Sequence, residues 1–203
     1  MPYRVFITLA AALFALTGCG DDGPGIPPPP PPPPDRQNVK VERKAADLPP
    51  KTLSEPEIAA LKSRITELWQ AGLERDVTKV MKMSHFRLFE ISGGRLAAEE
   101  AWKVAMEKFD EIGMVLVSEE LGEPSPVYRS DDGYVVFVPS KVIASSDKGR
   151  AQVDGFHIAI GDVGTWKFLG SHGISKDKSL IEKLIPGLEA AAIFPTHTAK
   201  EIE

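Results

Sequence analysis

The sequence predicts an α+β fold in which helices come first and an antiparallel sheet follows. Apolar residues at helical spacing fill the region between Pro50 and Gly113. After Gly113 the apolar pattern changes to that of β-strands, and turn sequences separate the strand-like runs at short intervals. Helices and strands that are segregated along the chain in this way are typical of α+β domains, whereas alternating strands and helices favour a parallel sheet.

Residues 1–18 are expected to be a lipoprotein signal peptide. After the positive charge of Arg4, Val5–Leu16 form an apolar run broken only by Thr8. The run is shorter than the ~20 residues that span a bilayer and is typical of secretory signals. It ends in Leu16-Thr17-Gly18-Cys19, which resembles the lipobox of bacterial lipoproteins. The resemblance implies cleavage before the cysteine and its acylation (for example by palmitate), with membrane lipid as a partner. An ordinary secretory signal with an incidental cysteine is the simpler alternative.

Cys19 also limits the chemistry of the rest of the chain. It is the only cysteine in the sequence, so a mature domain with Cys19 acylated has neither a disulfide nor a thiolate metal site. We expect a location in the bacterial cell envelope, lipid-anchored at the outer membrane and facing the periplasm. The inner membrane stays open, because Gly20 and Asp21 follow the cysteine and retention rules differ between bacterial groups.

Residues 19–51 are expected to form a disordered, lipid-anchored spacer. Pro27–Pro34 is an unbroken proline run, and proline fixes the backbone in the polyproline II conformation. At about 3.1 Å per residue this rod reaches roughly 25 Å from the lipid surface. The alternative is a docking ligand for a proline-reading domain.

The remaining sequence is expected to be one domain over residues 52–195, followed by a disordered tail over 196–203. Its length is enough for a hydrophobic core. The formal net charge of the whole chain is −5 and no lysine- or arginine-rich patch is present, which argues against nucleic acid as a partner.

Three helices are expected in the first half of this domain. Ser54 and Glu57 form a capping box at the start of the first helix. Asp76 can cap a short second helix, and Ala97–Ile112 form a third that ends at Gly113. The apolar stripe of the first helix consists of Ile58, Leu61, Ile65, Leu68 and Trp69.

The second half is expected to be an antiparallel meander that ends in a short helix over Lys176–Leu184. Tight turns with an Asp-Gly or Lys-Gly pair end at Gly133 and at Gly149, and a third turn spans Gly161–Gly164. The expected strands are Met114–Glu119, Val127–Arg129, Tyr134–Ile143 with its continuation to Ser146, Ala151–Ile160 and Thr165–Ser171.

This order of elements resembles the NTF2-like (cystatin-like cone) superfamily. Local features that recur there are an acidic residue near the second helix, here in Glu74-Arg75-Asp76-Val77, and a late strand with Trp166-Lys167-Phe168. The tail Ile185-Pro186-Gly187-Leu188, ending near Phe194-Pro195, is similar to that of exported members. The resemblance implies N-terminal helices packed against a curved antiparallel sheet around a conical pocket. Members of the superfamily include isomerases, dehydratases, ligand-binding proteins and contact modules.

The pocket candidates are five polar or aromatic residues. Isomerases of this superfamily need a carboxylate base opposite hydrogen-bond donors that stabilise an enolate. The candidates here are Asp154 and His157 on one predicted strand, with Tyr128 and Tyr134 as possible donors. Asp154 and His157 face opposite sides of a regular strand, so both enter the pocket only if Gly155 forms a bulge. A structural His157 and a solvated Asp154 are the simpler alternatives. The full set of pocket candidates is His85, Tyr134, Asp154, His157 and Trp166.

Two more of these candidates also have simpler structural alternatives. His85 follows the second helix near the expected pocket mouth, and a helix-capping or solvent-exposed histidine is the alternative there. Trp166 is more simply explained as a core residue than as part of a cofactor site, as are Met81, Met83, Trp102 and Met106. The scattered histidines show no metal-ligand spacing, so we expect neither a metal site nor a cofactor.

The sequence therefore favours a non-enzymatic, membrane-tethered NTF2-like module that binds a small apolar ligand or an envelope protein. The sequence does not determine whether the domain is catalytic. A small pocket enzyme of the isomerase, dehydratase or hydrolase kind is therefore the alternative. A homodimer packed through the sheet is compatible with both.

Overall fold

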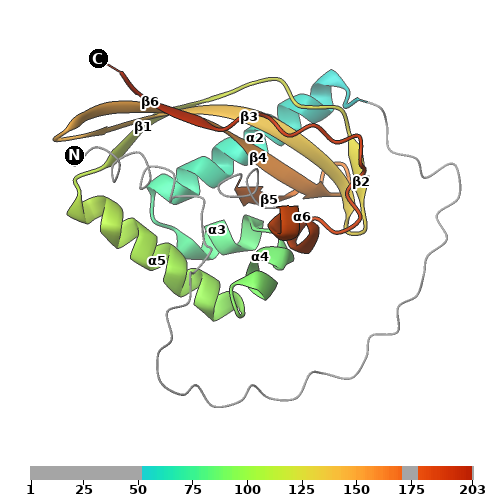
Figure 1. Cartoon of the computed structure of the whole chain (residues 1–203), viewed down its shortest axis with the longest axis horizontal. Helices are drawn as coiled ribbons and strands as arrows, with labels where there is room; N and C mark the ends of the chain where they lie inside the picture. Colours follow the sequence, from blue (N-terminus) through green and yellow to red (C-terminus); the bar gives the residue numbers. More distant parts are fainter. Residues whose placement is uncertain (1–51, 171–177, 203) are drawn as a thin grey trace, which may run out of the picture.

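The computed structural model describes residues 52–170 and 178–202, which form five helices and a six-stranded antiparallel sheet (Figure 1). The predicted α+β class is confirmed. The predicted signal peptide, Cys19 and the predicted spacer lie outside the described residues. The helices are α2 (Glu55–Leu73), α3 (Val77–Met83), α4 (Phe86–Ile91), α5 (Arg95–Glu111) and α6 (Lys178–Leu184). The strands are β1 (Val115–Leu121), β2 (Tyr128–Ser130), β3 (Gly133–Ser146), β4 (Gly149–Gly161), β5 (Lys167–Gly170) and β6 (Thr198–Ile202).

The start of α2 follows the predicted capping box. The backbone N–H of Ser54 donates to Glu57 Oε2 at 2.7 Å, and the Ser54 hydroxyl donates to the same oxygen at 2.6 Å. These hydrogen bonds lower the pKa of Glu57, because they stabilise its ionised form. At the start of α3, Asp76 accepts a hydrogen bond from the backbone N–H of Lys79 at 2.9 Å, as the sequence predicted.

Helix α4 was not predicted. It begins after His85, whose Nδ1 faces the backbone N–H of Arg87 at 3.5 Å. It is six residues long and ends at Ile91, shortly before Gly93-Gly94, where both glycines have positive φ. A helix of this length covers fewer than two turns, so it shows no recognisable apolar stripe.

The long hairpin of β3 and β4 is the centre of the sheet. Its register runs without interruption from Ser146 paired with Gly149 to Tyr134 paired with Gly161. Strands β1 and β2 pair with β3, and β5 and β6 pair with β4. Because β4 contains no bulge at Gly155, Asp154 and His157 lie on opposite faces of the sheet.

The C-terminal segment corrects one prediction. The sequence indicated a disordered tail over 196–203, but Thr198–Ile202 form strand β6, which pairs with Arg150–Asp154 of β4. The side chains of β6 are exposed or half-buried, so the segment carries no apolar pattern. Its order comes from backbone pairing with the edge of β4, which the side-chain sequence does not reveal.

Both faces of the central hairpin are covered. Val136, Val138 and Ala159 pack on one face against α2, together with Phe168 and Trp166. On the other face lie Phe137, Phe156 and Ile158, which pack against α6 and the segment that follows it. Figure 1 shows α2 to α5 gathered on one side of the sheet, with α6 near β2 and β5. A third cluster joins α3 and α5 to the far end of β3 and β4.

None of the helices in the described part of the chain combines the length and the apolar character that crossing a membrane requires.

Candidate functional site

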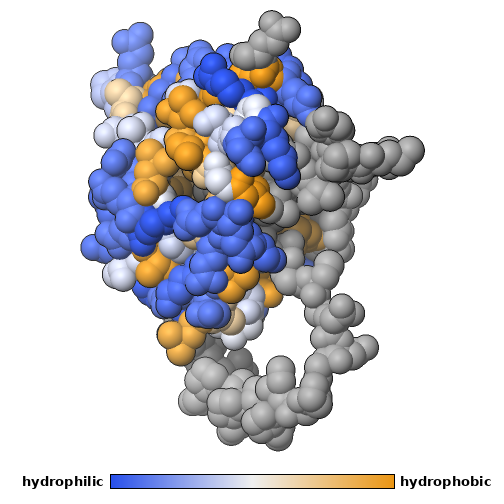
Figure 2. Space-filling view, turned by 90° about the vertical axis from the view of Figure 1, so that its left-hand side faces the viewer, coloured by the Kyte–Doolittle hydropathy of each residue, from blue (hydrophilic) through white to orange (hydrophobic). Residues whose placement is uncertain are grey.

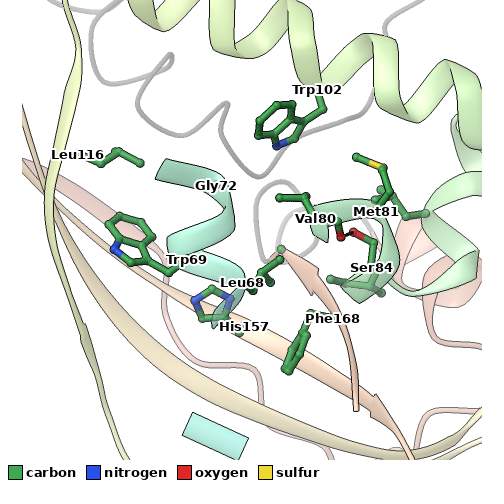
Figure 3. A pocket seen from close by; sticks show the side chains of 13 residues that line it. Leu68, Trp69, Gly72, Val80, Met81, Ser84, Trp102, Leu116, His157 and Phe168 are labelled. Carbon is green, nitrogen blue, oxygen red and sulfur yellow. Dashed lines mark hydrogen bonds between the residues drawn. The ribbon is translucent and has the colours of Figure 1, made fainter. Parts of the chain in front are cut away.

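An apolar cavity lies between α2, α3, α5 and the sheet (Figure 3). Its volume is about 90 Å³, and it opens to the surface. Helix α2 contributes its C-terminal turn, where Gly72 leaves room because it has no side chain. The lining residues are Leu68, Trp69, Gly72, Val80, Met81, Ser84, Leu88, Trp102, Leu116, His157, Phe168, Leu169 and Gly170.

His157 is the titratable side chain among these lining residues, and it is held by a buried carboxylate. Its Nε2 lies 2.7 Å from Glu119 Oε1, and the two side chains are only 3% and 4% exposed. Glu119 comes from β1 and His157 from β4, on either side of β3. Their alignment follows from the register, because Glu119 pairs with Val142 and therefore lies on the same face as His157.

Hydrogen bonding assigns the pair a defined arrangement. An ionised carboxylate only accepts hydrogen bonds, so Nε2 of His157 carries the proton that lies between the two groups when Glu119 is ionised. Such a histidine–carboxylate pair orients the imidazole ring, and it is also the arrangement that general bases use.

Ser84 also lines the cavity, but its hydroxyl is not arranged as that of a serine nucleophile. Its Oγ donates to the backbone carbonyl of Val80 at 2.9 Å, within the last turn of α3. A serine nucleophile instead requires a base within hydrogen-bond reach of its hydroxyl. In Figure 3, Ser84 lies on the opposite side of the cavity from His157. The two residues therefore do not form a nucleophile–base pair.

His85 lies outside the cavity lining. It is buried, with 4% exposure, and it occupies the position before α4, which is the capping role that the sequence offered as an alternative. Burial lowers the pKa of His85, and the nearby Arg87 lowers it further, while Asp132 opposes both effects. The solvent-exposed alternative for His85 is wrong.

The other three pocket candidates lie elsewhere. Tyr134 and Trp166 pack in the core cluster against the N-terminal half of α2, and neither lines the cavity. Asp154 lies on the far face of the sheet, where it accepts hydrogen bonds from Gln152 Nε2 at 2.8 Å and Thr198 Oγ1 at 3.0 Å. Of the five candidates, His157 alone is in the cavity lining.

Sequence reasoning missed two residues of the site. Glu119 ended a predicted strand, but nothing in the sequence paired it with His157. Trp102 was taken as a core residue; it is indeed buried, at 6% exposure, yet it also lines the cavity. Within residues 52–170 and 178–202, no group of three or more acidic, histidine or cysteine side chains is arranged to hold a metal ion.

The outer edge of β1 carries exposed apolar side chains. Val115 and Val117 are 60% and 51% exposed, and among the described strands β1 pairs only with β3. On the face shown in Figure 2, hydrophobic side chains lie above and below a band of hydrophilic ones. The homodimer expected from the sequence stays a prediction, and this edge is where a second sheet can pair.

No protein-family model, curated protein or solved structure matches the chain.

Proposed function

We propose that the chain is a cell-envelope lipoprotein whose folded domain binds a small apolar ligand without transforming it. The observation that carries the proposal is the cavity between α2, α3, α5 and the sheet. Its lining is mostly aliphatic and aromatic, while its titratable side chain, His157, is engaged by Glu119 and its hydroxyl, on Ser84, by the backbone. Sites for small molecules are typically apolar with few polar groups.

The size of the cavity bounds the ligand. An apolar cavity of about 150 Å³ in another protein binds benzene, and the volume here is about 90 Å³. The enclosed part therefore accepts a small ring or a short alkyl segment, and a larger ligand extends through the opening. An NTF2-like cone around this cavity is part of the proposal, supported by the element order and by the helices packed on one face of an antiparallel sheet.

The membrane tether is the second part of the proposal. It is supported by the apolar N-terminal run, the lipobox-like motif at Cys19 and the proline-rich segment that follows. We propose that acylated Cys19 holds the domain at the outer membrane, facing the periplasm. In a Cys19→Ser variant, the protein should move from the membrane to the soluble fraction. Unchanged membrane fractionation of this variant would exclude lipidation as the anchor.

Gly72 provides a direct test of ligand binding. An added Cβ at Gly72 meets no atom within 4 Å, and Gly72 is not among the glycines with positive φ, so the backbone accepts leucine. Because Gly72 lines the cavity, we expect the leucine side chain to fill part of it. We expect ethylbenzene to bind the full chain, and we expect its affinity for Gly72→Leu to be lower by at least about tenfold. The stability should not fall, because glycine in a helix costs about 0.5–1 kcal/mol relative to alanine. Isothermal titration calorimetry measures the binding, and urea denaturation measures the stability.

Ala60→Leu is the matched control for this experiment. It places the same side chain on the same helix at an exposed position. The control should bind ethylbenzene as the unmodified chain does. Equal binding by Gly72→Leu, or no binding by the unmodified chain, would contradict the proposal.

The buried pair of His157 and Glu119 favours a second candidate function, a small pocket enzyme that removes a proton next to a carbonyl. Its test is the exchange of the methyl protons of acetophenone for deuterium in D₂O, followed by NMR. Exchange that the chain accelerates and that His157→Gln abolishes would support the enzyme. Binding of acetophenone without accelerated exchange supports the non-enzymatic module.

A further inference from the structure

Trp102 presents an unused hydrogen-bond donor to the cavity. The indole lies on α5 and is 94% buried, as its relative exposure is 6%. No acceptor among the described residues pairs with its Nε1–H. Figure 3 shows the indole at the α5 side of the cavity, with its nitrogen turned toward the space that the labelled side chains surround. In the unliganded protein, water that enters the cavity can accept this hydrogen bond.

The other polar groups of the cavity lining have a hydrogen-bond partner in the protein or are partly exposed. His157 is paired with Glu119, and the Ser84 hydroxyl donates to the backbone. Trp69 is only partly buried, so its indole N–H can be hydrated from the surface. Trp102 is therefore the residue in the cavity lining that is more than nine-tenths buried and whose donor has no acceptor among the described residues.

A ligand that fills the cavity displaces the water at Trp102. Displacing a hydrogen-bonded water by a group that cannot replace its bond lowers affinity, because a buried donor is left unpaired. Indole is a donor only, so the replacement must be an acceptor. A charged acceptor is disfavoured, because the lining is apolar apart from His157 and Ser84, and His157 already pairs with Glu119.

We propose that the ligand is an uncharged apolar molecule bearing one hydrogen-bond-accepting oxygen, of the ketone or ester class, which accepts from Nε1 of Trp102. This inference rests on the proposed function, because it names the ligand class of the same cavity. The hydrocarbon part lies against the aliphatic and aromatic lining, and the oxygen fixes its orientation at the α5 side.

Acetophenone and ethylbenzene form a matched pair of probes, because they share the ring and the carbon skeleton and differ in the carbonyl oxygen. Both are titrated into the full chain by calorimetry. One net hydrogen bond corresponds to about a threefold to tenfold difference in affinity, so acetophenone should bind more tightly by this factor. In Trp102→Phe, which keeps an aromatic ring but lacks the N–H, the preference should disappear.

Trp166→Phe is the control variant, because Trp166 is buried to a similar extent but does not line the cavity. It should keep the preference for acetophenone. A measurement on the unmodified chain avoids any effect of substitution on folding. In ¹H–¹⁵N spectra, acetophenone should shift the indole N–H signal of Trp102 downfield, whereas ethylbenzene should not.

The outcomes separate the two proposals. If neither probe binds, the cavity is not a ligand site and the proposed function fails. If both probes bind with equal affinity and the Trp102 N–H signal does not move with acetophenone, the cavity binds apolar ligands but the inference about the oxygen is overturned. A preference for acetophenone that Trp102→Phe retains also overturns it, because another group must then recognise the carbonyl.

Discussion

At the scale of single residues, the pair of Glu119 and His157 links the sheet to the cavity. It joins the edge strand β1 to β4 through side chains that are nearly inaccessible to solvent. A buried polar group that loses its partner stays dehydrated, and no hydrogen bond then offsets that cost. Removing one member of the pair should therefore destabilise the fold by more than the net attraction between the two side chains contributes.

Replacing Glu119 by alanine tests this reasoning. The substitution leaves His157 buried without its carboxylate partner, and we expect the free energy of unfolding to fall by about 1–3 kcal/mol. Glu119→Gln should lose less, because its amide oxygen still accepts a hydrogen bond. Urea denaturation measures both.

Glu120→Ala is the neighbouring control. Glu120 is exposed and pairs with Lys141 on the surface, so its loss should have little effect on stability. A Glu119→Ala chain as stable as the Glu120→Ala chain would show that the buried pair contributes nothing.

His85 gives a prediction about pH. Burial lowers its pKa below the usual 6.5, so the unfolded chain binds a proton more readily than the folded one. The contribution of His85 to stability is complete above about pH 6.5 and is lost as the pH falls toward its folded-state pKa. His85→Asn keeps a residue suited to the position before a helix and removes the titrating group. Urea denaturation at pH 7.5 and at pH 5 gives the free energy of unfolding at each pH. Its decrease between the two should be smaller for the variant than for the unmodified chain, and equal decreases would refute the role of His85.

At the scale of elements, the predictable parts are those whose signals are local. The capping box at Ser54, the cap at Asp76 and the turn before Gly149 each depend on neighbouring residues, and each lies where the sequence predicted it. Helix α4 and strand β6 were missed, because one is too short for a stripe and the other has no buried side. Their order depends on tertiary packing and backbone pairing.

Gly187 fixes the path of the segment that follows α6. Its φ is +66°, and the backbone beside it is tied to the β2–β3 turn by the hydrogen bond from Asp131 N–H to Pro186 O at 2.9 Å. An added Cβ at Gly187 would collide with the carboxylate of Asp131. A residue other than glycine is disfavoured there by both backbone conformation and space.

Gly187→Ala and Gly164→Ala separate these two effects. Gly164 also has positive φ, at +92°, but an added Cβ there meets no atom within 4 Å. Left-handed backbone costs about 1–2 kcal/mol for a residue with a Cβ, which is the loss expected for Gly164→Ala. Gly187→Ala should lower the free energy of unfolding clearly more than Gly164→Ala does, as measured by thermal or urea denaturation. Equal losses would mean that Asp131 moves aside without cost.

At the scale of the whole molecule, the sequence predicted the class of the fold and much less of the site. His157 lines the cavity, but its partner Glu119 depends on how β1 aligns with β3, and side-chain patterns alone do not determine that register. Trp102 has the spacing of any core residue, so its sequence position does not distinguish a packed indole from one that faces a cavity. The cavity exists because separate elements leave space between them.

The central claim is that this cavity carries an apolar ligand in the cell. Native mass spectrometry of the full chain, purified from the cells that produce it alongside Gly72→Leu, tests it most directly. The account predicts that the unmodified chain carries a bound small molecule, released on unfolding, and that Gly72→Leu does not. An unmodified chain that carries nothing, or a Gly72→Leu chain that carries the same molecule in the same amount, would contradict it.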